Sequence, residues 1–143
     1  MRTNGQERAE FALEKINKHK IDKELKSLTA GAPTVILQNG FGQAMAFWLS
    51  KTKTKGGDKY KFVFNSIKEW LTKKNFIAPI ASYNSGDDDE SSKAFIKKLS
   101  EIDQSKYLCA QREALQLLEW IKRYAAAFCE DEDEQANNDE VKP

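Results

Sequence analysis

The chain has 143 residues, of which 40% are hydrophobic, and a formal net charge of +1. This length corresponds to one domain, which can bury enough surface to fold without disulfides or metals. No stretch approaches 18 consecutive apolar residues, and the N-terminus lacks the apolar region of a signal peptide, so we expect neither a membrane span nor export. In an intracellular protein Cys109 and Cys129 are expected to be reduced thiols.

The small net charge conceals an uneven distribution. Residues 130–143 contain seven acidic residues and one lysine, a net charge of −6, which leaves residues 1–129 with +7. We therefore divide the chain into a helical domain, 1–129, and an acidic tail, 130–143, that has too few apolar residues to fold and is expected to be disordered. A basic body favours an anionic partner, although a solvated lysine-rich surface with a solubilising tail explains the charges more simply.

Hydrophobic periodicity predicts helices almost throughout and no convincing strand, which indicates an all-α fold: a single bundle of about five to six helices. The first helix is expected over 6–28, with the turn 30–33 ending it. Pro33 suits the first turn of a second helix over 33–51. Gly40 and Gly42 then fall inside this helix, where each costs about 1 kcal/mol of helix stability relative to Ala. A compensating reason is therefore expected, and the close approach of another backbone is the one that we predict.

The remaining elements follow a basic loop at 51–57. A third helix over 58–74 is expected to be capped by Asp58. The acidic run 87–90 predicts the start of a fourth helix, because acids complement the dipole there. A last helix is predicted from an N-cap at Ser105 to about Cys129. The residues expected on its wide apolar face are Leu108, Leu115, Leu118, Ile121, Ala125 and Phe128.

Little in the sequence suggests catalysis. The only histidine, His19, lies between two lysines without an Asp, Ser or Cys at a useful local spacing, so a catalytic triad or a histidine-based metal site is not expected. The acids at 87–90 lack the spacing of a calcium loop and are better explained as a helix start. We therefore predict no catalytic residue, no cofactor and no metal.

Three groups of polar residues are candidates for binding. Lysines crowd between Lys51 and Lys61 beside two aromatic residues, which suits contact with phosphates, or alternatively a solvated loop. Asn39 and Gln43 begin a small polar row on the second helix. On the last helix a row that includes Arg112 and Gln116 is typical of a surface face with a Glu119–Arg123 ion pair, but it also suits a nucleic-acid contact.

Two segments of the chain resemble a known family. Residues 33–51 are similar to its Pro-led helix with Gln-Asn-Gly and Ala-Phe, and residues 107–125, including Arg-Glu-Ala-Leu, are similar to its C-terminal helix. Together with Arg8 and the Trp-Leu pair at 70–71, the resemblance covers about residues 7–128. The family is the small subunit of the Cmr complex, the type III-B CRISPR effector that targets RNA.

The resemblance implies a non-catalytic, cytoplasmic subunit whose copies stack head to tail into a minor filament. It implies as partners the other Cmr subunits, further copies of this chain, guide RNA and target RNA, with the chain lining the channel that holds the RNA duplex. From the polar groups described above, the residues that we assign to RNA binding are Asn39, Gln43, Lys51, Lys53, Lys55, Arg112, Lys122 and Arg123.

Two other functions fit the sequence less well. A free-standing helical adaptor would use the acidic tail to bind a basic partner, and would show no salt-dependent affinity for RNA. A small metal-dependent nuclease would use the acids at 87–90 and would require a divalent ion for cleavage.

Overall fold

The computed structural model describes residues 1–78 and 88–130, and within them every regular element is a helix. The predicted all-α bundle is therefore confirmed, while most of the acidic tail, 131–143, lies outside the described residues. The helices are α1 (Asn4–Asn17), α2 (Lys23–Asn39), α3 (Phe41–Lys51), α4 (Asp58–Lys73), α5 (Asp88–Glu101) and α6 (Gln104–Phe128).

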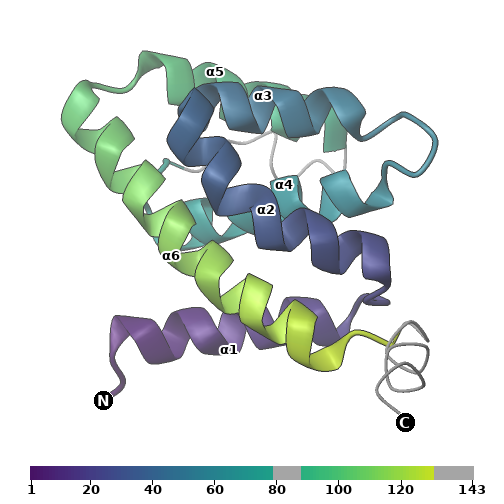
Figure 1. Ribbon diagram of the computed structural model, residues 1–143. Coiled ribbons are helices and arrows are strands. Elements are labelled where there is room, and N and C mark those ends of the chain that lie inside the picture. Colours follow the sequence, from purple (N-terminus) through teal and green to yellow (C-terminus); the bar gives the residue numbers. More distant parts are fainter. Residues whose placement is uncertain (79–87, 131–143) are drawn as a thin grey trace, which may run out of the picture.

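The long helix α6 organises the bundle. It runs beside α2 and across α1 in Figure 1, and it packs against α1, α2 and α4. Helix α3 forms the opposite edge, where it packs against α4, α5 and α2. At the end of α6 the backbone N–H of Glu130 donates to the carbonyl of Ile21, 2.9 Å away. This bond fixes the last described residues of the chain beside the turn between α1 and α2.

The first predicted helix, 6–28, is wrong: the structure divides it into α1 and α2. Helix α1 ends at Asn17, and Asp22 starts α2 by accepting a hydrogen bond from the N–H of Leu25 at 2.8 Å. The predicted stop at 30–33 is also wrong, because α2 continues through Pro33. Proline removes one backbone hydrogen bond, but Pro33 and Ile36 are buried, and tertiary packing of this kind sustains a helix against unfavourable propensity.

The second predicted helix, 33–51, is interrupted at Gly40, which ends α2 and starts α3. Gly40 has φ 89° and ψ 155°, a conformation that is essentially restricted to glycine. No atom lies within 4 Å of the position where its Cβ would be, so the predicted close approach is wrong for this residue. At Gly42 the neighbour is a side chain: a Cβ would lie 3.3 Å from the Tyr107 hydroxyl, which accepts the Gly42 N–H at 2.7 Å.

Two of the predicted helix starts are shifted. Asp58 is the first residue of α4 and Gly57 is its N-cap, with no side-chain hydrogen bond. Helix α6 is capped by Asp103, whose side chain accepts the N–H of Lys106 at 2.9 Å, and Ser105 lies inside the first turn. Asp103 and Ser105 are both residue types that cap helices well, and only the backbone geometry decides which of them is the N-cap.

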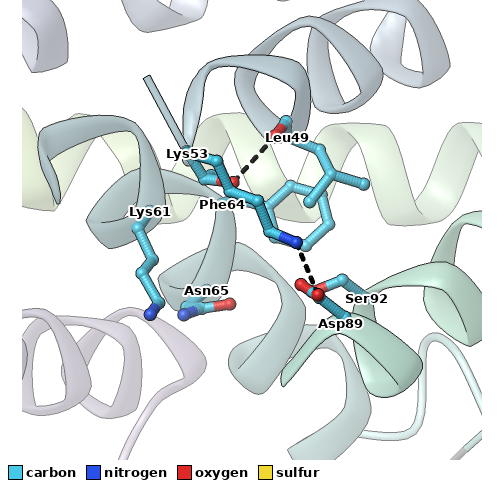
Figure 2. Close-up of a pocket in the computed structure, with 8 residues that line it drawn as sticks. Leu49, Lys53, Lys61, Phe64, Asn65, Asp89 and Ser92 are labelled. Carbon is cyan, nitrogen blue, oxygen red and sulfur yellow. Dashed lines mark hydrogen bonds and ion pairs between the residues drawn. The ribbon is translucent and has the colours of Figure 1, made fainter. Parts of the chain in front are cut away.

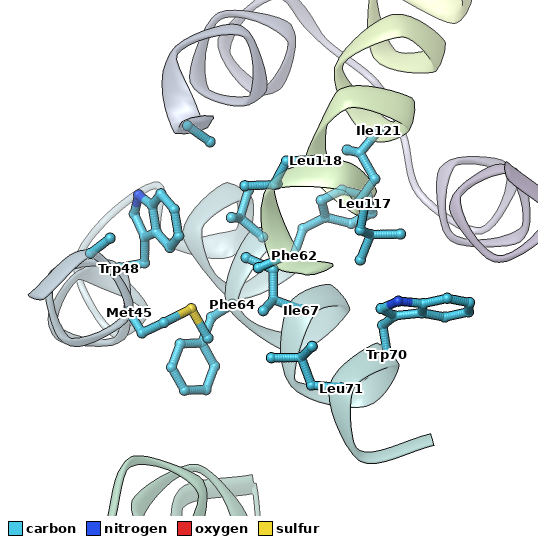
Figure 3. Packing of buried hydrophobic residues seen from close by; sticks show 14 of the residues in the cluster. Met45, Trp48, Phe62, Phe64, Ile67, Trp70, Leu71, Leu117, Leu118 and Ile121 are labelled. Atoms are coloured by element: carbon cyan, nitrogen blue, oxygen red, sulfur yellow. The ribbon is translucent and has the colours of Figure 1, made fainter. Parts of the chain in front are cut away.

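One apolar core connects the helices. Figure 3 shows Met45 and Trp48 of α3 facing Phe64 and Ile67 of α4, with Leu118 from α6 completing the layer. The expected burial of Leu118 and Ile121 is confirmed, and Trp70 is buried as well. Two residues predicted to lie on the apolar face of the last helix are instead exposed, Leu108 at 44% and Phe128 at 50%, and Leu37 of α2 is 68% exposed.

A buried carboxylate links three helices. Glu113 of α6 accepts two hydrogen bonds from Arg8 of α1, one of them at 3.0 Å, and a third from Trp70 Nε1 of α4 at 2.8 Å. Burial acts to raise the pKa of Glu113, but the hydrogen bonds from Arg8 and Trp70 outweigh it and hold the pKa below its usual value. The ionised carboxylate is therefore part of the native packing.

We expect Glu113→Gln to lower the free energy of unfolding by about 3–5 kcal/mol, because it leaves Arg8 without its buried partner. A depressed pKa stabilises the fold above the unfolded value and loses that contribution as the pH falls. Lowering the pH below 4.5, the ordinary pKa of Glu, should therefore destabilise the native chain more than the variant. Denaturant titrations at a series of pH values measure this difference. Parallel pH profiles would contradict this role.

The break at Gly40 can be tested against a glycine inside a helix. Gly40→Ala should destabilise the fold by about 1–3 kcal/mol, since alanine rarely adopts this conformation. Gly31→Ala is the matched control, because Gly31 is helical with open space around it, and its substitution should be neutral or stabilise by up to about 1 kcal/mol. Thermal unfolding of both variants measures the difference, and equal changes would contradict it.

Candidate nucleic-acid interface

The polar residues Asn39 and Gln43 lie at the corner between α2 and α3. Both side chains are exposed, and the Asn39 amide donates to the carbonyl of Val35 at 3.2 Å. Because Gly40 separates the two residues into different helices, they do not belong to one helical row as predicted. The corner is nevertheless fixed, since the Gly42–Tyr107 hydrogen bond ties it to the first turn of α6.

The basic loop at the end of α3 is partly neutralised. Lys53 forms an ion pair with Asp89 of α5 at 2.6 Å, and Lys51 lies over the ring of Phe47, 5.6 Å from its centroid. Lys55 is exposed. The hydrogen bond and positive charge of Lys53 hold the pKa of Asp89 below its usual value, so this acid is ionised at neutral pH. The sequence does not reveal this pairing, which joins residues 36 positions apart.

A pocket of about 60 Å³ opens beneath this ion pair, between the end of α3, helix α4 and the start of α5. Figure 2 shows Lys53 reaching across it to Asp89, with Lys61 and Asn65 on the α4 side. A broader depression of about 490 Å³ continues along α5 past Lys93. A phosphate bound here would compete with Asp89 for Lys53, which makes the pocket a weaker anion site than its lysines alone suggest.

Helix α6 presents a different arrangement. Arg112 and Arg123 are eleven positions apart, which places them within about 20° of each other around the helix axis. Both are exposed, and in the described part of the chain neither forms an ion pair. Lys122, which points about 100° away from Arg123, pairs with Glu119 at 3.4 Å. Glu119 thus takes Lys122 as its partner in place of the expected Arg123 and leaves both arginines available to a ligand.

The predicted residues do not form one compact site. They lie at the α2–α3 corner, on the loop at the other end of α3, and along α6 (Figure 1). Helix α3 separates the first two places by roughly 16 Å, and Arg123 lies a similar distance along α6 from Arg112. Charges distributed in this way suit an extended polyanion better than a small ligand.

A row of aromatic residues at the surface of α6 was missed by the sequence reasoning. Trp120, Tyr124 and Phe128 follow one another along the helix; Trp120 and Phe128 are 36% and 50% exposed, and Tyr124 is half-buried against the core. Their spacing of four residues predicts a row on one helix face. The same spacing is usual in a buried stripe, so the sequence alone gives no signal that this row is at the surface.

Other chemistry finds little support among residues 1–78 and 88–130. No group of three or more His, Cys, Asp or Glu side chains there could hold a metal ion, and Asp87 of the acidic run lies outside these ranges. His19 packs on Phe62 with ring centroids 4.8 Å apart, and its Nδ1 lies 3.0 Å from the carbonyl of Lys20. None of the described helices is long and apolar enough to cross a membrane.

A family model described as CRISPR-associated protein (Cas_Cmr5) matches residues 4–128. The chain belongs to this family. The match spans all six helices and ends where α6 ends, and it confirms the resemblance to the small subunit of the type III-B Cmr complex. The protein is thus a member of a structural small-subunit family of the Cmr complex, which acts in CRISPR defence, and its partners include other Cmr subunits.

The Lys53–Asp89 ion pair at the basic loop can be tested by substitution. Asp89→Asn should remove this acidic partner of Lys53 and strengthen RNA binding by the complex at low salt. The slope of log affinity against log salt should become steeper by up to about 0.7 for a single strand, since one more phosphate contact releases counterions. Filter binding across a salt series measures this change.

Glu101→Gln is the matched control, because Glu101 also pairs with an exposed lysine, Lys97, at 3.3 Å near the end of α5. An equal effect of the two substitutions would show that only the overall charge matters.

Proposed function

We propose that this chain is a non-catalytic, cytoplasmic subunit of the Cmr ribonucleoprotein that lines the channel holding the guide RNA–target RNA duplex. In this proposal copies of the chain stack head to tail into a minor filament beside the guide-binding backbone. Membership of the family supports a place in the complex. The contacts with RNA and with further copies are the proposed part.

The observation that carries the proposed RNA contact is a pair of exposed arginines on one face of α6 that have no acidic partner among the described residues. In the basic loop, by contrast, Lys53 already has an acidic partner and Lys51 an aromatic neighbour. An arginine held out from a rigid helix can bind phosphate in a bidentate manner. The net charge of +7 on residues 1–129 acts in the same direction.

A non-catalytic role is supported by the composition of the sequence. A single histidine and two cysteines provide little material for general acid–base or nucleophilic catalysis. His19 packs on an aromatic ring at one end of the bundle, away from any acidic cluster in the described residues. Cleavage within the complex is accordingly assigned to other subunits.

The experiment compares Arg112→Gln/Arg123→Gln with the native chain in a reconstituted Cmr complex. Target-RNA affinity should fall to a similar extent for unrelated sequences, and the salt slope should flatten by up to about 0.7–0.9 per lost contact. Cleavage at saturating RNA should persist, because no catalytic group is removed.

Arg2→Gln/Lys97→Gln is the control of equal charge. Both of these cations already have acidic partners, Glu10 and Glu101, so their removal should leave the slope nearly unchanged. An unchanged slope in the double arginine variant would reject the RNA contact and favour an adaptor role. Loss of cleavage with RNA fully bound would reject the non-catalytic role.

A further inference from the structure

The aromatic row on α6 is built as a surface feature. The ring centroids of Trp120 and Tyr124 are 5.7 Å apart, and those of Tyr124 and Phe128 are 6.2 Å apart, with interplanar angles of 33° and 35°. Neighbouring rings thus support one another in a ladder about two turns long. Trp120 remains 36% exposed and Phe128 50% exposed, so the ladder presents ring surface to the outside.

The ladder lies beside the unpaired arginines. Trp120 is three positions before Arg123 and four after Gln116, so each is one turn from its ring. Arg112 lies eight positions, or about two turns, before Trp120 and within about 80° of it around the axis. This side of α6 therefore combines the exposed ring of Trp120 with two cations and an amide.

This combination selects among the possible ligands. The charge of this face favours an anionic ligand, because Arg112 and Arg123, which have no acidic partner among the described residues, both lie on one side of Trp120. Aromatic rings beside basic side chains are the usual means of binding single-stranded nucleic acid, because unpaired bases offer a free face for stacking. A duplex hides those faces and would use only the arginines.

We propose that the aromatic ladder of α6 stacks on unpaired RNA bases, with Trp120 as the main platform and Arg112 and Arg123 holding the backbone. The ligand is thus a single-stranded RNA segment, bound in a sequence-tolerant manner. This inference rests on the proposed function only in that RNA lies along α6. It adds that the segment in contact with this face is unpaired.

The protein carries its own probe for this contact. Of its three tryptophans, Trp48 and Trp70 are 0% and 2% exposed. Collisional quenching of fluorescence by acrylamide therefore reports on Trp120. Stacking of a base on the indole should quench its emission and shield it from acrylamide.

The experiment titrates the full-length chain at low salt with poly(A) and with the duplex poly(A)·poly(U). We expect poly(A) to quench Trp120 and protect it from acrylamide, while the duplex binds with the indole still accessible. Equal effects of the two polymers, or no quenching by poly(A) at saturation, would overturn the proposal. Shielding that increases with protein concentration without RNA would mean that the ladder is a protein contact, and would also overturn it.

Substitutions provide a second measurement. Trp120→Ala should weaken poly(A) binding by about 5- to 150-fold, the equivalent of the 1–3 kcal/mol per stacked base found by alanine substitution. Trp120→Phe should restore most of the affinity, because it keeps an aromatic face. Leu37→Ala, which removes another exposed apolar side chain, should have no effect, and circular dichroism checks that each variant folds.

The double variant Arg112→Gln/Arg123→Gln separates this inference from the proposed function. If it flattens the salt slope while poly(A) leaves Trp120 unquenched, RNA lies on α6 but base stacking is rejected. If the slope and the fluorescence both stay unchanged, the RNA contact itself is rejected.

Discussion

The position of α6 depends on the buried carboxylate of Glu113. Its oxygens accept hydrogen bonds from Arg8 of α1 and from Trp70 of α4, so one side chain fixes the rotation of α6 against two other helices. A buried ion pair is costly to form and more costly to break, and this favours a single arrangement of the three helices. With Glu113 directed inward, Arg112 and Arg123 are about 80–100° away around the axis, and both side chains are exposed. The same interaction that holds the bundle thus places its unpaired cations.

Pairing between helices decides which cations remain available. Lys53 and Lys59 are bound by Asp89 and Glu24, on helices that are distant in the sequence, whereas the two arginines of α6 are left without such partners. A count of basic residues treats all of these side chains alike. Binding of a polyanion depends mainly on the cations that have no acidic partner. A lysine that is already paired with a carboxylate gains little free energy by exchanging it for a phosphate. Helix α6 is for this reason a stronger candidate for RNA contact than the lysine-rich loop.

The exposed ring surface of Trp120 and Phe128 is in contact with water, which is unfavourable for apolar surface. Trp120, Tyr124 and Phe128 cover part of one another, which reduces the exposed apolar area but does not remove it. In an assembled complex such a row would be covered by a ligand or a neighbour. The adjacent arginines favour a ligand with both charge and flat apolar faces, and unpaired RNA has both. Within the described residues, α6 thus carries core side chains on one side and exposed rings and cations on another.

The sequence by itself determined the fold class, the last helix and most of the core. Residues such as Trp70, Leu118 and Ile121 repeat at helical spacing, and burial of apolar surface follows that spacing. It could not predict the break at Gly40, because glycine is compatible both with a helical backbone and with the positive φ that Gly40 adopts. Nor could it predict that Pro33 lies inside α2 or that Phe128 is exposed, since packing from other helices decides both. Only the tertiary structure showed which charges are paired, because ion pairs such as Lys53–Asp89 join residues that the chain order keeps apart.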